Sequence, residues 1–443
     1  MKKQMKLVVA GTSILTLGVV VGAGVLTLGL VGQANAFHSG GVAKCESCHT
    51  MHNSFSGKTM IGTTGDLSSK TANSNTSVQT MLLQGTDASS ACLNCHGDGS
   101  STSSYHVKTE GATTNSVPQQ MSPGGDFSWT MVDCQGNTTR NNRRGHNIVA
   151  ADFSMAADAT LTVAPGGTYP NTRLACSSCH DPHGKYRIDA AGATTTTGKP
   201  IGASGSYAST TTAATGAYDL GVYRFLAGVG YNPKSLTNAG IDKTFTAAPP
   251  VALAPSTYNT TTLGATAGVR VAYGSGMSEW CANCHTAMHS TSSQTSGAMG
   301  VHPASNGNKL GATIAANYNA YKKTGDMTGS QATANLNLVA FETGAIGDAA
   351  GRAALTALQA TTAGPDATAN VMCLSCHRAH ASGFESMLRW DQVNNELLTD
   401  TAGAYKATAG LNTDQQLAAY YNKPSTDFAV AQRSLCNKCH AKD

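Results

Sequence analysis

The sequence predicts a single domain of mostly irregular chain with short α-helices and few short strands, whose core is not made of its own side chains. Composition is the first reason. Of the 443 residues, 12% are charged, 6% are aromatic and 48 are glycine, and long tracts of Ser, Thr and Ala show little sustained periodicity. Burial of so few large apolar side chains does not offset the backbone entropy lost on folding. We therefore expect a bound group to supply apolar surface.

The cysteines are the second reason, and they indicate what is bound. Twelve of the 13 fall into six copies of Cys-x-x-Cys-His, the pattern that attaches haem c. In chain order, motifs 1 to 6 are Cys45-Cys48-His49, Cys92-Cys95-His96, Cys176-Cys179-His180, Cys281-Cys284-His285, Cys373-Cys376-His377 and Cys436-Cys439-His440. In a helical turn these positions share one face, so two thiols can reach one porphyrin while the histidine lies over its iron. The sequence predicts six haem c groups, stacked into a chain that forms the core.

Two other interpretations of the cysteines explain less of the pattern. A disulfide framework leaves the histidine after every pair unexplained, and zinc ribbons would combine the pairs two by two with no use for that histidine. Cys134, in "VDCQGNTTR", stands outside the motifs, and we expect a free thiol with no assigned role. An intermolecular disulfide at this cysteine is the alternative.

The first 36 residues have the pattern of a signal peptide. Three lysines lie within the first six residues, an uncharged apolar run covers residues 7–31, and Ala34-Asn35-Ala36 forms an A-x-A cleavage site before Phe37. We expect removal of residues 1–36 and a single hexahaem domain over residues 37–443. The apolar run is long for a signal peptide, so an uncleaved membrane anchor is the alternative. Export agrees with haem c, because this haem is attached outside the bacterial cytoplasm.

The charge balance argues against a nucleic-acid partner. Loss of the three N-terminal lysines lowers the formal net charge of +4 to about +1. Twelve haem propionates then bring it to roughly −5 in the oxidised protein and roughly −11 in the reduced protein. The sequence also has no basic stripe of the kind that binds a nucleic-acid backbone.

Regular structure is expected to be sparse between the motifs. Their first cysteines lie at positions 45, 92, 176, 281, 373 and 436, so attachment sites span the chain and no haem-free domain fits. We therefore interpret the polar tracts between motifs as irregular chain that covers haem faces, although alone they resemble disordered linkers. Short helices are expected at the motifs and over residues 314–323, 350–359 and 414–421, with a short strand near residues 269–273.

Eight histidines outside the motifs are candidates for the second axial ligand of the irons. They are His38, His52, His106, His146, His183, His289, His302 and His380. Six irons need six distal ligands, so every haem can be bis-histidine with two histidines to spare. The histidines that directly follow a motif lie on the proximal side of their own porphyrin; they are His52, His183, His289 and His380. Each of these must ligate a different haem or none, which would clamp neighbouring haems together.

Methionine is the competing distal ligand and would raise the potential of its haem. The available residues are Met51, Met121, Met277, Met288, Met372 and Met387. We predict low-potential bis-histidine ligation for all six haems, with the methionines filling gaps against haem edges. Trp129, Trp280 and Trp390 are expected to pack on haem or to cover it.

The ligand count favours an electron carrier over an enzyme. Haems with both axial positions filled have no open site for a substrate, so they pass single electrons and do not activate small molecules. A multihaem reductase of nitrite, hydroxylamine or tetrathionate type would need an open or unusual iron ligand, and no Cys-x-x-Cys-Lys is present. A monomeric periplasmic or outer-surface electron shuttle is the other alternative.

Seven stretches resemble the OmcS-type hexahaem outer-surface cytochromes of metal-reducing bacteria, which polymerise into conductive filaments. They are "AFHSGGVAKCESCHTMHNS", "MLLQGTDASSACLNCH", "GHNIVAADFSM", "CSSCHDPHGKYR", "VAYGSGMSEWCANCHT", "CLSCHRAHASGF" and "LCNKCHAKD". The stretches include the haem motifs, candidate distal histidines and haem-free segments in order along the chain. The sequence differs from the family in the Ser/Thr/Ala tracts and around Cys134.

This resemblance implies head-to-tail subunits and one continuous chain of haems that alternates parallel and T-shaped pairs. It also implies that His52 ligates a haem of the neighbouring subunit, the one held by Cys373, Cys376 and His377. Electrons would enter from periplasmic and outer-membrane cytochromes and leave to extracellular acceptors such as metal oxides or partner cells. The mature protein would lie at the cell outer surface, in an extracellular filament.

Overall fold

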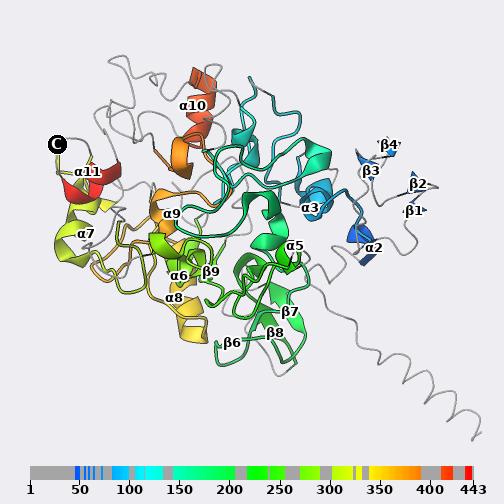
Figure 1. Ribbon diagram of the computed structural model, residues 1–443. Coiled ribbons are helices and arrows are strands. Elements are labelled where there is room, and N and C mark those ends of the chain that lie inside the picture. Colours follow the sequence, from blue (N-terminus) through cyan, green and yellow to red (C-terminus); the bar gives the residue numbers. More distant parts are fainter. Residues whose placement is uncertain are drawn as a thin grey trace, which may run out of the picture.

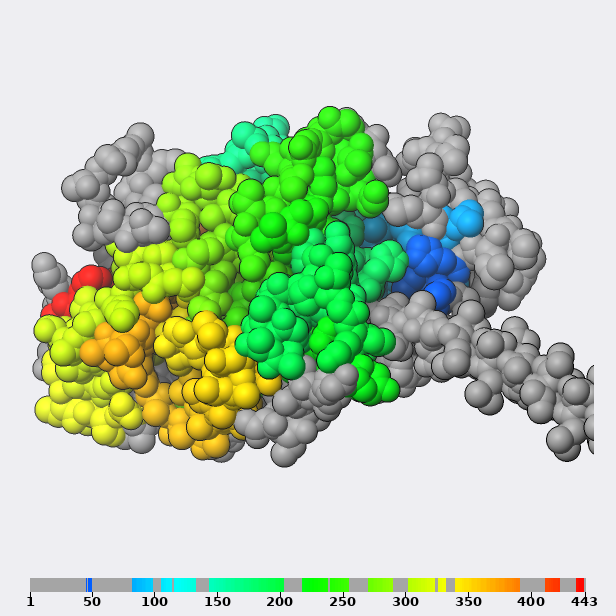
Figure 2. Space-filling view, turned by 90° about the horizontal axis from the view of Figure 1, so that it is seen from below, coloured from blue at the N-terminus to red at the C-terminus, as the bar shows by residue number. Residues whose placement is uncertain are grey.

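The computed structural model of the chain describes residues 45–49, 54–55, 58–59, 63–64, 71–72, 82–98, 105–113, 115–132, 143–204, 217–237, 240–254, 270–289, 302–322, 326–331, 339–390, 411–422 and 435–441. Within them the chain is mostly irregular, with short helices and short strands, so the predicted fold class is confirmed. The segments of motif 1 and motif 6 lie at opposite ends of the molecule (Figures 1 and 2). No helix within these residues has the length and apolar character that crossing a membrane requires.

The helices are short, and most of the motifs begin on one. The α-helices are α2 (Cys45–Cys48), α3 (Ala88–His96), α5 (Lys234–Thr237), α6 (Met277–Cys281), α7 (Gly311–Ala320), α8 (Ala349–Gln359), α9 (Cys373–Cys376), α10 (Thr413–Ala419) and α11 (Leu435–His440). The 3-10 helices are η1 (Phe127–Thr130), η2 (Ala151–Phe153), η3 (Asn171–Arg173), η4 (Cys176–Ser178), η6 (Tyr223–Phe225), η7 (Thr286–Met288) and η9 (Glu385–Met387). Motif 3 differs from the other motifs because it begins on η4 and not on an α-helix.

The strands are two to four residues long and pair locally. They are β1 (Ser54–Phe55), β2 (Lys58–Thr59), β3 (Thr63–Thr64), β4 (Thr71–Ala72), β5 (Arg187–Ile188), β6 (Thr194–Thr195), β7 (Ile201–Ser204), β8 (Asp219–Gly221), β9 (Val251–Leu253) and β10 (Ala272–Ser275). The largest sheet has the order β6-β5-β8-β7, in which β7 runs parallel to β8 and the other neighbours are antiparallel. β9 pairs antiparallel with β10, and β10 leads into α6 and motif 4.

The predicted regular elements are found, with shifted ends. The helix expected over residues 314–323 is α7, and it ends at Ala320 because Tyr321 has extended backbone (φ −71°, ψ 113°). The helix expected over residues 350–359 is α8, and the one over 414–421 is the shorter α10. The strand expected near 269–273 is β10, although residue 269 lies outside the described residues.

Side-chain caps begin α3, α8 and α10. Asp87 accepts a hydrogen bond from the Ser90 amide at the start of α3 (2.8 Å), and Asn412 caps α10 together with Gln415. Such interactions satisfy amides that the first helical turn leaves unpaired. α3 carries the whole of motif 2, so its cap helps to fix that motif.

A buried carboxylate holds the loop in front of η1. Asp126 is 0% exposed and accepts hydrogen bonds from the Thr109 hydroxyl (2.5 Å) and the Ser128 amide (2.7 Å). Burial raises the pKa of Asp126, and these donors act in the opposite direction. The fixed loop presents the Gly124 carbonyl to the His380 amide (2.6 Å), which places the segment after motif 5.

The apolar interior is divided into small clusters. One of them contains Trp129, Phe384 and Trp390, and Cys376 of motif 5 packs against its edge. In the same way, Cys284 packs at the edge of the cluster around Tyr186, one of several such clusters. Motif cysteines therefore lie at the borders of the apolar clusters, where a porphyrin attached to them would bury its faces.

We expect Trp129→Ala to lower the free energy of unfolding by about 3–5 kcal/mol, because removal of a buried indole leaves a cavity. Trp129 is 1% exposed and packs with Phe384 and Trp390. Tyr218, which is 49% exposed, is the matched control, and Tyr218→Ala should cost less than about 0.5 kcal/mol. Urea unfolding followed by circular dichroism measures both variants. Equal losses in the two variants would contradict this packing.

Candidate functional site

The motif segments follow one another through the molecule in sequence order. In Figure 1, α2 and α3 lie on one side of the molecule, α6 and α9 lie one above the other nearer its middle, and α11 lies on the opposite side. Thiols of successive motifs interact electrostatically; the pairs are Cys48 with Cys95, Cys92 with Cys176, Cys179 with Cys284, Cys281 with Cys373, and Cys376 with Cys439. The attachment sites therefore form one line with a motif adjacent to each neighbour in sequence.

The contacts along this line alternate. Motif 2 meets motif 3, and motif 4 meets motif 5, through their first cysteines. At the other junctions the second cysteines of successive motifs interact, and Cys376 also interacts with Cys436, the first cysteine of motif 6. Both first-cysteine junctions also share a hydrogen bond: the Ser89 hydroxyl accepts from the Cys176 amide (3.2 Å), and the Ser278 hydroxyl accepts from the Cys373 amide (3.1 Å). The same junction is thus built twice from different parts of the chain.

Motifs 1, 3 and 5 share a return of the chain beside the motif histidine, which we name the leucine turn (residues 82–84, 224–227 and 386–389). Its leucine forms a β-bridge with that histidine; the pairs are Leu83 with His49, Leu226 with His180, and Leu388 with His377. The next residue donates its amide to the carbonyl of the second motif cysteine at 2.8–2.9 Å; the pairs are Gln84 to Cys48, Ala227 to Cys179, and Arg389 to Cys376. Three motifs far apart in sequence therefore have one backbone arrangement.

Left-handed backbone precedes the leucine in every leucine turn. The residues are Leu82 (φ 52°), Arg224 (φ 48°), Phe225 (φ 51°), Ser386 (φ 56°) and Met387 (φ 59°). Non-glycine residues in this region cost on the order of 1–3 kcal/mol each, so the surrounding contacts must fix them. The conformation aims a carbonyl at the motif histidine: the Nδ1–H of His180 donates to Arg224 O (2.8 Å), and that of His377 donates to Ser386 O (2.7 Å).

Other candidate ligands also use Nδ1 to contact a backbone carbonyl. The pairs are His96 with Tyr105 (2.8 Å), His285 with Pro165 (2.9 Å), His146 with Ala379 (2.6 Å) and His302 with Pro303 (2.9 Å). Metal-binding histidines commonly donate one ring N–H to a carbonyl, which fixes the ring and leaves the other nitrogen for the metal. In these histidines the nitrogen left for a metal is Nε2.

Motif histidines at four positions face a second histidine across gaps of similar size. The ring centroids are 6.2 Å apart for His49 and His183, 6.4 Å for His180 and His380, 5.9 Å for His285 and His146, and 6.2 Å for His440 and His302. Because metal–imidazole bonds are about 2.0–2.1 Å and a ring centroid lies about 1.1 Å beyond its nitrogen, two imidazoles across one metal have centroids roughly 6.3 Å apart. The observed gaps therefore fit one metal ion between the two rings.

The remaining motif histidines, His96 and His377, differ from each other. His106 directly follows Tyr105, whose carbonyl accepts a hydrogen bond from His96. It is also one of the groups that lower the pKa of His96. For His377, the described part of the chain provides no histidine ring at the spacing of the other pairs. His38 and His52, like Cys134 and Met51, lie outside the described residues.

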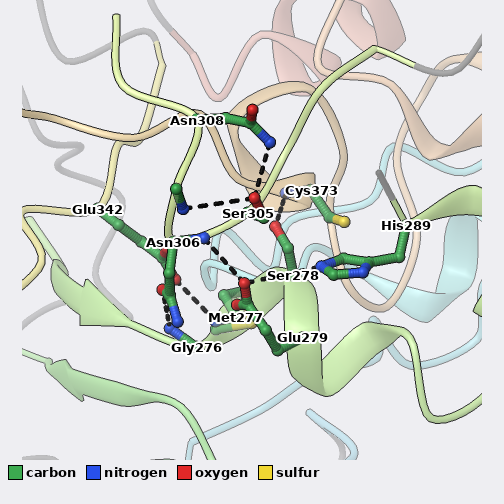
Figure 3. A network of polar contacts seen from close by, with 11 residues as sticks. Gly276, Met277, Ser278, Glu279, His289, Ser305, Asn306, Asn308, Glu342 and Cys373 are labelled. Atoms are coloured by element: carbon green, nitrogen blue, oxygen red, sulfur yellow. Dashed lines mark hydrogen bonds and ion pairs between the residues drawn. The ribbon is translucent and has the colours of Figure 1, made fainter. Parts of the chain in front are cut away.

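His289 is placed away from the motif histidines. Its Nε2 lies 3.7 Å from Glu279 Oε1 on α6, and the two side chains are 20% and 30% exposed (Figure 3). Of the methionines considered as ligands, Met277 and Met372 are buried together in one apolar cluster. Trp280 packs on Phe245 and donates its indole N–H to Ala227 O (2.6 Å).

Burial favours the neutral form of five candidate ligands. It lowers the pKa of His146 to about 4 and that of His380 to about 3, with nearby histidines adding to the effect. Burial also lowers the pKa of His96, His180 and His377. A neutral imidazole has a free lone pair for a metal, so these positions are prepared for ligation at ordinary pH.

These features fit a covalently attached haem with an imidazole on each face. Two thiols sit beside each motif histidine, the facing rings leave space for an iron, and the Nδ1 contacts orient Nε2. A bound haem c supplies one-electron chemistry. Where two rings face each other, the chain's own residues would lie on both sides of a bound iron, which would leave no room for a substrate there.

Comparison with known proteins identifies the family. The chain is 48% identical over 426 residues to the C-type cytochrome OmcS of Geobacter sulfurreducens, a match that covers 92% of this chain and 94% of that protein. The chain belongs to the OmcS family of c-type cytochromes. The cryo-EM structure of OmcS nanowires from the same organism is similar to it with a TM-score of 0.76 and 46% identity. That match covers 92% of this chain and 100% of the OmcS chain, and no protein-family model matches.

A second solved structure, the outer membrane cytochrome S filament from Geobacter sulfurreducens, also has a TM-score of 0.76, with 47% identity over 92% of this chain. The resemblance drawn from the motifs is confirmed. As an OmcS-family c-type cytochrome, the chain binds haem c and is an electron conduit, not an enzyme. The leucine turns were not found from sequence, because a leucine after two unremarkable residues carries no distinctive signal.

We expect His146→Ala to create one carbon monoxide binding site per reduced chain, because the iron at His285 would lose the ring that faces it. His289→Ala is the matched control, since His289 contacts Glu279, and it should create none. Carbon monoxide titration of the reduced proteins, read in the Soret band, measures the number of sites. A new site in the control variant, or none in His146→Ala, would contradict the pairing.

Proposed function

We propose that the chain carries six haem c groups and conducts electrons along them in a head-to-tail filament outside the cell. The linear order of the six motifs supports a continuous electron path from one end of the subunit to the other. Membership of the OmcS family supports the filament, because the similar solved structures are of nanowires and filaments.

The proximal ligands in this proposal are the motif histidines, and each thioether pair is the cysteine pair of the same motif. The distal ligand is His183 for motif 1, His106 for motif 2, His380 for motif 3, His146 for motif 4 and His302 for motif 6. The ring pairs and the proximity of His106 to His96 support these assignments. His38 and His289 are the two histidines without a ligand role.

The distal ligand of motif 5 carries the filament proposal. Motifs 1, 3 and 5 have the spacing Cys-x-x-Cys-His-x-x-His. The last histidine of motif 3, His183, faces the proximal histidine of motif 1, and that of motif 5, His380, faces the proximal histidine of motif 3. In both pairs, the last histidine of one motif faces the proximal histidine of the preceding motif with the same spacing. If this pattern continues, the iron of motif 5 is ligated by the last histidine of a further motif with this spacing.

Motif 1 of the next subunit is that further motif, and its last histidine is His52. We infer that His52 of one copy ligates the iron at His377 of its neighbour. Motifs 1 and 6 lie at opposite ends of the molecule, which suits head-to-tail contact. The subunit junction would then repeat a junction that already exists twice inside the subunit.

The cellular setting follows from this role. Removal of residues 1–36 would release a mature domain of residues 37–443, which is exported for haem attachment and then assembled at the cell outer surface. Periplasmic and outer-membrane cytochromes would donate electrons to it. Extracellular acceptors, such as metal oxides or partner cells, would receive them, and nucleic acid has no part in the mechanism.

We expect His52→Ala to abolish or strongly shorten the filaments while leaving the subunits folded and haem-loaded, because the motif 5 iron would lose its ligand from the neighbour. His289→Ala is the matched control and should assemble normally. Negative-stain electron microscopy of the purified proteins gives filament length, and pyridine haemochrome absorbance gives the haem content. Filaments of unchanged length in His52→Ala would rule out the intersubunit ligand and favour a monomeric shuttle.

We expect the secreted protein to begin at Phe37 and to carry six haems. Intact-mass spectrometry of the protein from the culture supernatant and cell surface measures both quantities at once. A mass that includes residues 1–36 would favour the membrane-anchor interpretation of the N-terminus. A mass with fewer haems would show that some motifs are not loaded.

A further inference from the structure

A buried glutamate lies between the segments that carry motifs 4 and 5. Glu342 is 0% exposed, and its backbone pairs with Tyr273 of β10 and with Asn370. β10 leads directly into α6 and motif 4, and Asn370 lies three residues before motif 5. The Glu342 side chain therefore lies close to two successive haem attachment sites (Figure 3).

The carboxylate of Glu342 has one hydrogen-bond donor for its two oxygens. Oε1 accepts from the Met277 amide at the start of α6 (2.7 Å), while the buried Oε2 has no hydrogen-bond partner. Within the described part of the chain, Glu342 also forms no ion pair. A buried and unpaired carboxylate is costly to keep ionised, because burial removes its hydration without supplying a counter-ion.

Most of the surroundings of Glu342 disfavour ionisation of its carboxyl group. Burial has the largest effect and, together with Glu279 and Cys373, raises the pKa of Glu342 to about 8, while the Met277 amide acts in the opposite direction. Of the other elements packed against it, β10 contributes the phenol of Tyr273, and Lys309, whose backbone bridges to Asn370, has an exposed side chain. Cys373 is a thioether once haem is attached, so it no longer titrates.

A second pair of titratable side chains, Glu279 and His289, lies beside this region. Glu279 lies on α6, its Oε1 accepts from the Asn306 amide (2.8 Å), and His289 Nε2 lies 3.7 Å from the same oxygen. The Glu279 and His289 side chains are 30% and 20% exposed, while Glu279 Oε2 and His289 Nε2 are buried and have no hydrogen-bond partner among the described residues (Figure 3). Glu279 therefore adds negative charge close to Glu342.

We propose that Glu342 is a proton-binding site that couples proton uptake to electron arrival at the haems of motifs 4 and 5. When one electron reduces a neighbouring iron from ferric to ferrous, the Glu342 carboxylate takes one proton from water and becomes the neutral acid. The electron comes from the preceding haem, and the local charge is unchanged. Oxidation of the iron releases the proton again.

This coupling has a defined sign. A ferric iron carries one more positive charge than a ferrous iron, so it holds the pKa of Glu342 lower. Between the two pKa values, reduction binds a proton, and a rise in pH therefore makes the haem harder to reduce. The expected change is up to tenfold in the reduction equilibrium constant per pH unit, which is about 59 mV for one electron. Haem propionates titrate too, so a matched variant must separate their contribution.

We expect Glu342→Gln, tested as the full-length haem-loaded protein, to lose the part of the pH dependence of the haem potentials that Glu342 causes, because an amide cannot take up the proton. Spectroelectrochemical titration from about pH 5 to about pH 9 measures the pH dependence of the potentials. Glu110→Gln replaces an exposed glutamate and should retain the wild-type pH dependence. Identical pH dependence in all three proteins would overturn the proposal.

A second measurement needs no variant and protects against a folding defect in Glu342→Gln. The reduced-minus-oxidised infrared spectrum of the wild-type protein should show a new C=O band of a protonated carboxyl group that shifts in D2O. Absence of any such band would also overturn the proposal. The proposal rests on haem attachment at motifs 4 and 5, and the pyridine haemochrome assay tests that separately: missing haem identifies a failure of attachment, not of proton coupling.

Discussion

Two imidazole rings that face each other about 6 Å apart fix the positions of the two chain segments that carry them, and most of this structure depends on that constraint. His285 and His146 bring together residues 139 positions apart, and His380 and His180 join residues separated by 200. The apolar clusters between these points are small, and motif cysteines lie at their edges. The interior of the protein is therefore organised by where the porphyrins must lie, and the irregular chain follows their faces. Long tracts without regular structure are compatible with this design, because ligation and covalent attachment replace the continuous apolar core that helices and sheets normally enclose.

The subunit is built from a unit that recurs. Motifs 1, 3 and 5 have the same leucine turn, the same hydrogen bond to the second cysteine and the same Cys-x-x-Cys-His-x-x-His spacing. The junctions between motifs 2 and 3 and between motifs 4 and 5 repeat the hydrogen bond from a cysteine amide to a serine hydroxyl. In a repeat protein, the last unit lacks the contact that every internal unit receives from its neighbour. Within the described residues, His377 of motif 5 has no facing histidine ring, and on our proposal another copy of the same chain supplies it.

Sequence alone predicts the parts of the site whose chemistry is local. The motif spacing indicates haem c, and the helices at residues 350–359 and 414–421 follow from their own composition. Local geometry alone also prevents His183 and His380 from reaching their own iron, and both face other motif histidines in the structure. Which motif each one faces is a long-range property of the fold, as is the pairing of His146 with His285. Backbone strain at Arg224 or Ser386 and the burial of Glu342 depend on contacts with distant segments, so no local pattern predicts them.

Electron conduction through a buried chain raises the question of where charge is compensated. Each electron adds a negative charge to a region whose histidines are neutral, and in a medium of low permittivity nearby charges interact strongly. Electron transfer between equivalent haems changes the free energy little. A haem with a proton-binding group beside it differs from its neighbours, because its reduction is coupled to proton uptake. Glu342 is such a group for the pair of motifs 4 and 5, since it lies beside the Cys373 end of motif 5. Motif 5 is also the motif assigned to the ligand from the next subunit. On both proposals, protonation acts beside the motif that the next subunit ligates. Every electron passes this motif on its way along the line of haems, so a single buried carboxyl group would adjust transfer once per subunit.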